Sequence, residues 1–572
     1  MRWYGSRFGS RFGWVPALYS LVLSVLILGP MLGPGYLLLR DAVSTPRSYL
    51  TDSALGTTDA AARAVPQDAL VASLSTVADG GIVVKAIVLL ALWLAGWGAA
   101  QMVRTLLPTV GTPALLVSST VAIWNPYVAE RLLQGHWSLL VGYAALPWTV
   151  LAALACRRDG RWAWLAVSLA AAGLTPTGAI LAAVTALVVV ATGRSARRIG
   201  LTAALAGCAS LPWLAATAVT GSGTVGTDPA GVAAFAARAE PGLGTLGSLA
   251  GLGGIWNSDA VPTSRTTLFA LVGTALLLAI VALGLRPLWR RRGHPIIVVL
   301  AFLAAVAVLL PALAATGPGI GVGEWAATDL PGAGLLRDGQ KWVALAMPFY
   351  VLAAAAGTAW VGARLRSAWL PAVIAVLAIL IALPDLVWGV SGRLMPVHYP
   401  SSWSAIAAEL EGGDGDVAVL PAGMFRLFPY SGDAPVLDPA PRMLPLDVLQ
   451  TGELVVAGGT VRGEGVRARD VQDALIGGEP ATRLSELGVG WVLVELTTPG
   501  ELGNSARTLD QLDLAYRDNE LALYKVPGTV VVDTGDAATN LVVAAHLAWA
   551  ALLVSGLLWA VTRPIRARRH QT

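Results

Sequence analysis

Three short segments of this 572-residue chain combine side chains that could do chemistry, and each adjoins a long apolar run. The first is Arg40-Asp41, directly after Leu37-Leu38-Leu39. A carboxylate in this position could act as a base on a hydroxyl nucleophile. A charge pair at a helix end in the headgroup layer is the alternative. The other acids of this stretch form no tight pair with Asp41, so the pattern does not indicate a divalent metal, whose sites need several oxygen ligands.

The second segment, residues 125–137, lies between tryptophans and is rich in hydrogen-bonding side chains. They are Asn125, Glu130, Arg131, Gln134 and His136. Glu130 and Gln134 are four residues apart, so they would share one face of a helix. Charged side chains at membrane depth are costly and usually face a bundle interior or a cavity. This predicts a site, and an interfacial belt of Trp, Tyr and Arg is the alternative.

The third segment is Arg337-Asp338-Gly339-Gln340-Lys341-Trp342, directly before another apolar run. Two cations on the outer face of a membrane oppose the usual excess of basic residues inside. A phosphate at headgroup level would explain them, because arginine binds phosphate bidentately and lysine binds it as a point charge. Binding of lipid headgroups without any chemistry is the alternative.

The composition makes lipid the solvent for much of the chain. Hydrophobic residues make up 55% and charged residues only 13%, against roughly a quarter charged in soluble proteins. Runs long enough to span, at about 20 residues each, are 14–39, 82–103, 200–218, 267–285, 295–315, 342–361, 369–390 and 541–562. The first is too long for a signal peptide, so we expect it to be retained. No basic stripe with interleaved aromatics indicates nucleic-acid binding.

Two further regions, 110–155 and 162–192, resemble helical pairs with a break in the middle. The second breaks at Thr175-Pro176-Thr177-Gly178, and its arms are shorter than the roughly 20 residues that a span needs. We therefore predict short or re-entrant helices, and one bent helix is the alternative. The expected fold class is a mainly α, polytopic membrane helical bundle of about 12 membrane helices, with a small extracytoplasmic α/β domain.

Arginine clusters orient this bundle, because short cytoplasmic loops attract basic residues. The clusters are Arg2/Arg7/Arg11, Arg104, Arg157/Arg158/Arg161, Arg194/Arg197/Arg198, Arg286/Arg290/Arg291/Arg292, Arg364/Arg366 and Arg563/Arg566/Arg568/Arg569. We predict a multi-pass plasma-membrane protein with both termini cytoplasmic. Its parts would be a membrane domain, 1–395, with outer loops 40–81, 219–266 and 316–341; an extracytoplasmic domain, 396–535; and a final helix with a basic tail, 536–572.

Sequence patterns within 396–535 alternate between helix and strand. Helices are expected at 402–410, 470–476 and 481–487, and strands at 417–420 and 491–496. Residues 514–516 and 521–526 should form a hairpin around Asp518-Asn519-Glu520. The sequence therefore predicts a small α/β domain.

This order of elements resembles the C-type (GT-C) glycosyltransferase superfamily, whose members use polyprenyl-phosphate sugars. More closely, several segments resemble an actinobacterial mannosyl- or arabinosyltransferase-like group. They are Arg40-Asp41, Thr45-Pro46-Arg47, Ala64-Val65-Pro66-Gln67-Asp68, residues 125–137 with Ala145-Leu146-Pro147-Trp148, and Arg337 to Trp342.

The resemblance implies transfer of a sugar, mannose or arabinofuranose, from a polyprenyl-phosphate donor to a cell-envelope glycan or glycolipid on the outer face. Asp41 would be the catalytic base, with no cofactor and no metal. Substrate-binding positions would be Arg40, Arg47, Asn125, Glu130, Arg131, Gln134, His136, Arg337, Asp338, Gln340 and Lys341, with Arg337 and Lys341 on the lipid phosphate. Many members carry a paired acidic motif where this chain has the lone Asp41. That departure leaves room for another catalytic residue or for an inactive relative.

Two other functions stay open at this point. One is a non-catalytic scaffold in envelope assembly, with partners in that machinery. The other is a transporter or flippase for a lipid-linked precursor, which would need ionisable residues near the bilayer midplane. The predicted spans are nearly free of such residues. Convergence of Asp41, Glu130/Arg131 and Arg337/Lys341 on one cavity open to the lipid would favour an enzyme, and scattering would favour a scaffold.

Overall fold

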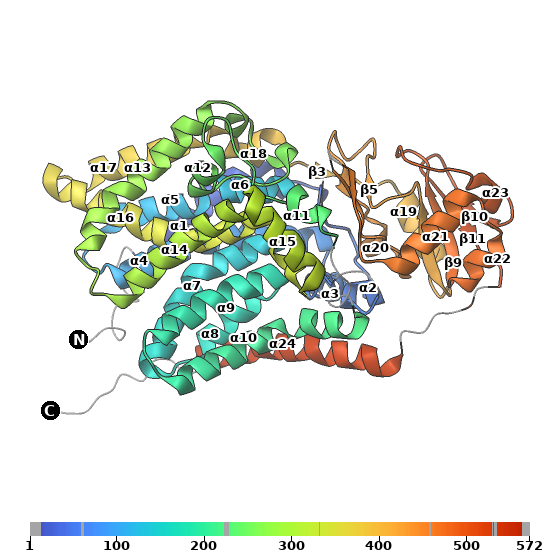
Figure 1. The fold of residues 1–572 in the computed structure, drawn as a ribbon, viewed down its shortest axis with the longest axis horizontal. Helices are drawn as coiled ribbons and strands as arrows, with labels where there is room; N and C mark the ends of the chain where they lie inside the picture. Colours follow the sequence, from blue (N-terminus) through green and yellow to red (C-terminus); the bar gives the residue numbers. More distant parts are fainter. Residues whose placement is uncertain are drawn as a thin grey trace.

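The computed structural model describes residues 13–58, 62–221, 228–330, 332–456, 459–528, 530 and 535–562. Within these ranges eight helices are long and apolar enough to cross a membrane, or nine if a bent pair counts as one span. The eight are α1 with a 3-10 turn (Val15–Leu32), α4 (Gly80–Leu106), α7 (Trp137–Asp159), α10 (Ala196–Thr220), α13 (Phe269–Trp289), α14 (Pro295–Ala314), η5 with α16 (Gly339–Leu365) and α24 (Asp536–Thr562). All but α7 coincide with a predicted apolar run. Figure 1 shows them packed as one bundle.

Two predicted runs are not continuous helices, and the prediction was wrong there. The helical part of the first run ends at Leu32, and Tyr36–Leu39 forms strand β1 after Gly33-Pro34-Gly35. The run 369–390 breaks after α17 (Trp369–Ala382), and the next segment, Pro384–Gly392, is bent away by 77°. Apolar composition does not distinguish helix from strand, and glycine and proline interrupt both.

The predicted paired helices are present as separate elements. The first region forms α5 (Thr112–Ile123), the short α6 (Pro126–Gln134) and α7. The second forms α8 (Ala163–Ala172) and α9 (Pro176–Ala191). Thr175 caps α9, since its Oγ1 accepts a 3.0 Å hydrogen bond from the Gly178 N–H. The total of about 12 membrane helices stays a prediction.

Several of the arginine clusters meet at one end of the bundle. Arg198 donates to the Arg157 carbonyl, and the Arg291 Nη2 donates to the Thr109 Oγ1 at 3.4 Å. The connections α4–α5, α7–α8, α9–α10 and α13–α14 therefore lie together, and the strands lie at the opposite end (Figure 1). The predicted clusters at the two termini, Arg2 to Arg11 and Arg563 to Arg569, fall outside the described residues. Which end faces the cytoplasm stays a prediction from the arginines.

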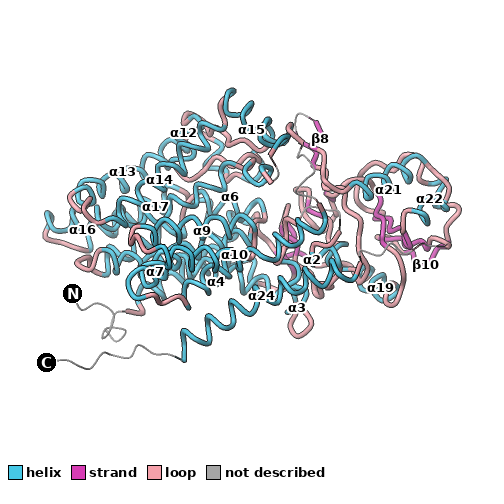
Figure 2. Tube along the Cα trace, turned by 60° about the horizontal axis from the view of Figure 1, so that its bottom comes forward, coloured by secondary structure: helices cyan, strands magenta, loops and turns pink. Residues whose placement is uncertain are grey.

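A four-stranded sheet of order β10-β11-β9-β4 organises the region after residue 400 (Figure 2). Its strands are β4 (Asp416–Leu420), β9 (Val489–Glu495), β10 (Asp513–Arg517) and β11 (Leu521–Lys525), and only the β4–β9 pair is parallel. Alternate side chains of β9 serve two cores. Trp491 and Leu493 pack in a cluster with α19 (Ser402–Glu409), and Val492 and Val494 pack with α21 (Val466–Gly477) and α22 (Ala481–Glu486). The predicted helices and strands of this region are all present.

A second, three-stranded sheet connects this region to the first loop. Strand β1 lies between β2 (Ala42–Val43) and β3 (Pro396–Val397), antiparallel to both. The N–H of Leu437, in strand β6 (Val436–Leu437), donates to the Arg40 carbonyl at 2.7 Å. Strand β6 itself pairs with β5 (Phe425–Arg426). The start of the first loop is therefore fixed between the helix bundle and the larger sheet.

Candidate active site

Strands β1 and β2 are joined by the two-residue turn Arg40-Asp41, which carries the predicted base. Arg40 has a φ of +49°, a conformation that side chains other than glycine rarely adopt. Its guanidinium holds this turn in place, because Nη1 donates to the Leu133 carbonyl and Nη2 to the Asp259 carbonyl, both at 2.7 Å. Arg40 therefore positions the Asp41 carboxylate through two backbone contacts.

Helix α6 ends directly against this turn. It begins at Asn125, whose Oδ1 accepts from the Val128 N–H at 3.1 Å, and it ends at Gly135 with a φ of +87°. The Asp41 N–H donates to the Gln134 carbonyl at 3.1 Å. A Cβ atom on Gly135 would lie 2.2 Å from the Ala42 nitrogen, so only glycine permits this approach.

Gly135→Ala is therefore expected to separate α6 from the turn. The positive φ alone costs roughly 1–2 kcal/mol for an alanine, and the clash with Ala42 adds to it. Gly160→Ala is the matched control, because Gly160 also ends a helix at positive φ (+69°) but a Cβ atom on it would have no neighbour within 4 Å among the described residues. Thermal unfolding in detergent should show a clearly larger loss of midpoint for Gly135→Ala. Equal losses in the two variants would contradict the close approach.

The Asp41 carboxylate is held on one oxygen and open on the other. Its Oδ2 accepts hydrogen bonds from Gln134 Nε2 at 3.1 Å and from His136 Nε2 at 2.9 Å. Among the described residues its Oδ1 has no hydrogen-bond partner, and 31% of the side chain is exposed. The His136 Nδ1 faces the Arg131 Nη1 at 2.8 Å and must accept, since a guanidinium only donates. The His136 proton therefore lies on Nε2, pointing at Asp41.

Charge states follow from these contacts. Burial alone would raise the pKa of Asp41, but the hydrogen bonds from His136 and Gln134 and the charge of Lys341 outweigh it and lower that pKa. Burial lowers the pKa of His136, and the charges of Arg131 and Lys341 lower it further. The hydrogen bond and charge of Asp41 raise this pKa but do not outweigh the other effects. Asp41 is therefore ionised and His136 neutral near pH 7, so the carboxylate has no proton of its own and can accept one.

Arg131 connects His136 to the third segment. Its Nη1 and Nη2 bind the two Asp338 oxygens at 2.8 and 3.0 Å, and Nη2 also donates to Gln340. The Arg131 side chain is 0% exposed and that of Asp338 is 6% exposed. Lys341 Nζ lies 3.8 Å from Asp338 and its side chain is 25% exposed. Arg131 is thus committed to protein partners, and Lys341 is the cation of this cluster that can reach a ligand.

Glu130 and Gln134 bind the predicted outer loop 219–266, whose part in the site the sequence did not indicate. Glu130 accepts from the Gly254 and Ile255 N–H groups at 3.2 and 3.1 Å, and from Gln340 Nε2 at 3.0 Å. Gln134 Oε1 accepts from Asn257 Nδ2 at 2.8 Å. Burial, and after it the nearby Glu240, raises the pKa of Glu130. These contacts are made mostly by backbone groups, so no residue type marked this loop in advance.

Three predicted site residues make no hydrogen bond or ion pair with this cluster among the described residues. Asn125 caps α6 and also donates to the Tyr143 hydroxyl. Arg47 lies over the Tyr49 ring and donates weakly to Ser75. Arg337 lies over the Phe235 ring at 4.4 Å, and its buried Nη1 has no hydrogen-bond partner among the described residues. The structure therefore gathers Arg40, Asp41, Glu130, Arg131, Gln134, His136, Asp338, Gln340 and Lys341, from three separate segments.

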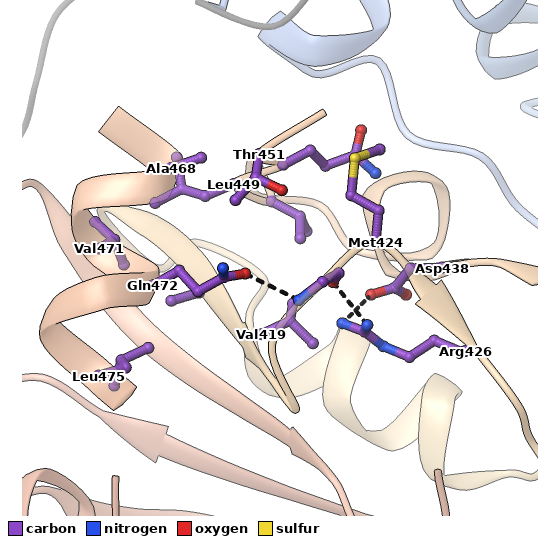
Figure 3. A pocket seen from close by; sticks show the side chains of 14 residues that line it. Val419, Met424, Arg426, Asp438, Leu449, Thr451, Ala468, Val471, Gln472 and Leu475 are labelled. Atoms are coloured by element: carbon purple, nitrogen blue, oxygen red, sulfur yellow. Dashed lines mark hydrogen bonds and ion pairs between the residues drawn. The ribbon is translucent and has the colours of Figure 1, made fainter. Parts of the chain in front are cut away.

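Two cavities lie outside this cluster. One, of about 30 Å³, is in the larger sheet region between Gln472, Thr451 and Asp438 (Figure 3), and it has room for about one water molecule. The other is an apolar groove of about 350 Å³ on the side of the bundle. Its lining comes from α13, α14 and α16, namely Val281, Leu285, Ala301, Ala304, Ala305, Val308, Leu309, Phe349 and Tyr350.

Comparison with known proteins finds similarity in structure only. No family model matches the chain, and no curated protein does. Two single-particle cryo-EM structures of the arabinofuranosyltransferase AftD from mycobacteria, the second a substituted variant, have TM-scores of 0.56 and 0.54 at 17% identity. They cover 92% and 93% of this chain, which spans 40% and 42% of theirs. The chain therefore shares its fold with part of a solved arabinofuranosyltransferase.

Proposed function

We propose that the protein is a membrane glycosyltransferase of the C-type group. It would transfer a sugar, arabinofuranose or mannose, from a polyprenyl-phosphate donor to a cell-envelope glycan or glycolipid. The reaction would take place at the end of the bundle that carries the sheets, which we assign to the outer face. The observation that carries the proposal is the Asp41 carboxylate, with one oxygen held and one open, near enough to the partly exposed Lys341 ammonium for its charge to lower the pKa of Asp41.

The charges of this pair suit the proposed step. The acceptor hydroxyl oxygen forms a bond to the anomeric carbon, the bond from that carbon to the phosphate oxygen breaks, and Asp41 takes the hydroxyl proton. The donor phosphodiester carries one negative charge, and the departing polyprenyl phosphate carries two. Lys341 therefore interacts more strongly with the leaving group than with the bound donor, and such differential binding lowers the barrier.

The apolar groove supports a lipid-linked donor. Its lining includes Phe349 and Tyr350 in α16, and α16 directly follows η5 (Gly339–Ala346), which carries Lys341. An isoprenoid chain in this groove would leave its phosphate near the start of η5. Branched hydrocarbon fits such a surface because the lining offers no side-chain charge.

Transfer of labelled sugar from polyprenyl-phosphate donors to envelope acceptors, with the purified protein in lipid vesicles, tests the proposal. Product that depends on the protein supports an enzyme. No product with well-folded protein and both arabinofuranosyl and mannosyl donors would overturn the proposal and favour the scaffold or transporter.

Lys341→Gln should lower kcat/KM by about 10²-fold, the usual loss when one group that stabilises developing charge is removed. Lys341→Arg should retain more activity, because it keeps the positive charge. Arg337→Gln is the comparison: it removes the neighbouring cation, which lies over Phe235. A larger loss for Arg337→Gln than for Lys341→Gln would move the phosphate site to Arg337.

The pH profile should be flat from about pH 6 to 8, because Asp41 and His136 both have pKa values below their usual values of about 3.9 and 6.5. Protonation of Asp41 removes the base, so kcat/KM should fall toward acid pH, as the pH approaches the lowered pKa of Asp41. The transfer rate, measured from acid pH up to about pH 8, checks this profile. If kcat/KM instead falls around the usual histidine pKa of about 6.5, and the fall is absent in His136→Asn, then His136 is the group that titrates.

A further inference from the structure

Helix α15 (Gly317–Asp329) follows the last apolar turn of α14 and has one face without a protein partner among the described residues. The chain turns sharply between them, since a Cβ on Gly319 would lie 2.1 Å from the Leu313 carbonyl oxygen. On its inner face, Gly323 approaches Val232 of α11 (Ala230–Ala234), and Ala327 is buried. In Figure 1, α15 lies between the helix bundle and the sheet region, inclined across the long axis of the molecule.

The outward face of α15 is apolar and continues the lipid-facing surface of α14. Val322 is 64% exposed and Trp325 57% exposed, and at three residues apart they share one side of the helix. Leu310 and Leu313, on the last turn of α14, are each 62% exposed. The two apolar surfaces therefore adjoin where the membrane span ends.

The sequence of α15 combines a tryptophan with several glycines. Residues 317–329 contain two acids, Glu324 and Asp329, and no lysine or arginine, and glycine occupies positions 317, 319, 321 and 323. Glycine is a poor helix former in water, so this helix depends on its surroundings for stability. Tryptophan is enriched at the boundary between lipid and water, where its ring is accommodated by both.

We propose that α15 is an interfacial helix whose Val322–Trp325 face contacts the lipid of the leaflet next to the candidate site. Apolar residues beyond the helix, Leu330 and Leu336, extend the same contact, since both are exposed. The segment that follows leads directly to Asp338 and Lys341. Lipid contact at α15 would thus hold Lys341 at the depth of lipid phosphates. This inference does not depend on sugar transfer.

Site-directed spin labelling of the full chain in phosphatidylethanolamine–phosphatidylglycerol vesicles tests it. Labels at Val322→Cys and Trp325→Cys, with Cys156 and Cys208 replaced by alanine, are compared for collision with oxygen, which partitions into lipid, and with a water-soluble nickel complex. Leu310→Cys is the lipid reference. Leu514→Cys, 53% exposed on strand β10, is the aqueous reference. Normal thermal unfolding of each labelled protein shows that it is folded.

The expected result is an oxygen-to-nickel collision ratio at positions 322 and 325 several-fold above that at 514, and closer to that at 310. A ratio equal to that at 514 would overturn the proposal, because the face would then be in water. Low collision with both reagents would overturn it as well, since a protein partner or a second copy of the chain would then cover the face.

Discussion

Replacing Asp41 with asparagine is expected to reduce sugar transfer by about 10²- to 10⁴-fold, the usual contribution of a general base. Asparagine has the same shape, and its amide oxygen can still accept from Gln134 and His136 as Oδ2 does now. What is lost is the ability to take a proton. Steady-state kinetics should therefore show a lower kcat with little change in KM for the donor.

Asp259→Asn is the matched control for this variant. The Asp259 carbonyl, not its carboxylate, holds Arg40, so the substitution keeps the contact that positions the turn. Its transfer rate should stay within about twofold of the wild type, as expected for a change that removes no functional contact. Transfer by Asp41→Asn at a tenth of the normal rate or more would place the base on another residue.

Azide provides a second readout for the same variant. It is an anionic nucleophile and needs no base, so a folded Asp41→Asn protein with an intact donor site should transfer the sugar to azide. Rescue by azide would show that only deprotonation is lost. No rescue, combined with a lowered unfolding midpoint, would indicate that Asp41 is needed for structure rather than for chemistry.

The sequence located most of this cluster because its residue types are costly beside a membrane. Glu130, Arg131, Gln134 and His136 fall within seven residues between apolar runs, and such side chains must find partners inside the protein. The sequence indicated which segments could contain their partners, but not which residues would contact which. The loop around Gly254, Ile255 and Asn257 contributes two backbone N–H groups and one amide, and neither gives a pattern that sequence can reveal.

The separate directions of Arg337 and Lys341 illustrate a different limit. Both cations fall on the predicted outer face, which favoured one phosphate site for both. In the structure Arg337 and Asp338 precede the 3-10 helix η5, and Lys341 lies inside it. Lys341 lies 3.8 Å from Asp338, and Arg337 lies over Phe235. The local backbone sets these two directions, and hydropathy carries no information about them.

Arg131→Met is expected to destabilise the protein by about 3–5 kcal/mol, the usual cost of leaving one partner of a buried ion pair alone. The Asp338 carboxylate, 6% exposed, would keep only Lys341, at 3.8 Å. Activity should fall as well, because His136 would lose the donor that fixes its proton on the side of Asp41. The apparent free energy of unfolding in mixed micelles and the transfer rate measure the two effects.

A double-mutant cycle with Asp338→Leu separates these effects. Replacing both partners by apolar side chains of similar size removes the unpaired charge, so the double variant should regain much of the stability lost in either single variant. Its activity should stay low, because the double variant still lacks the Arg131 contact to His136. Arg483→Met, in an exposed pair with Glu486, is the control and should cost at most about 1 kcal/mol. Strictly additive losses in the cycle would show that Arg131 and Asp338 act independently.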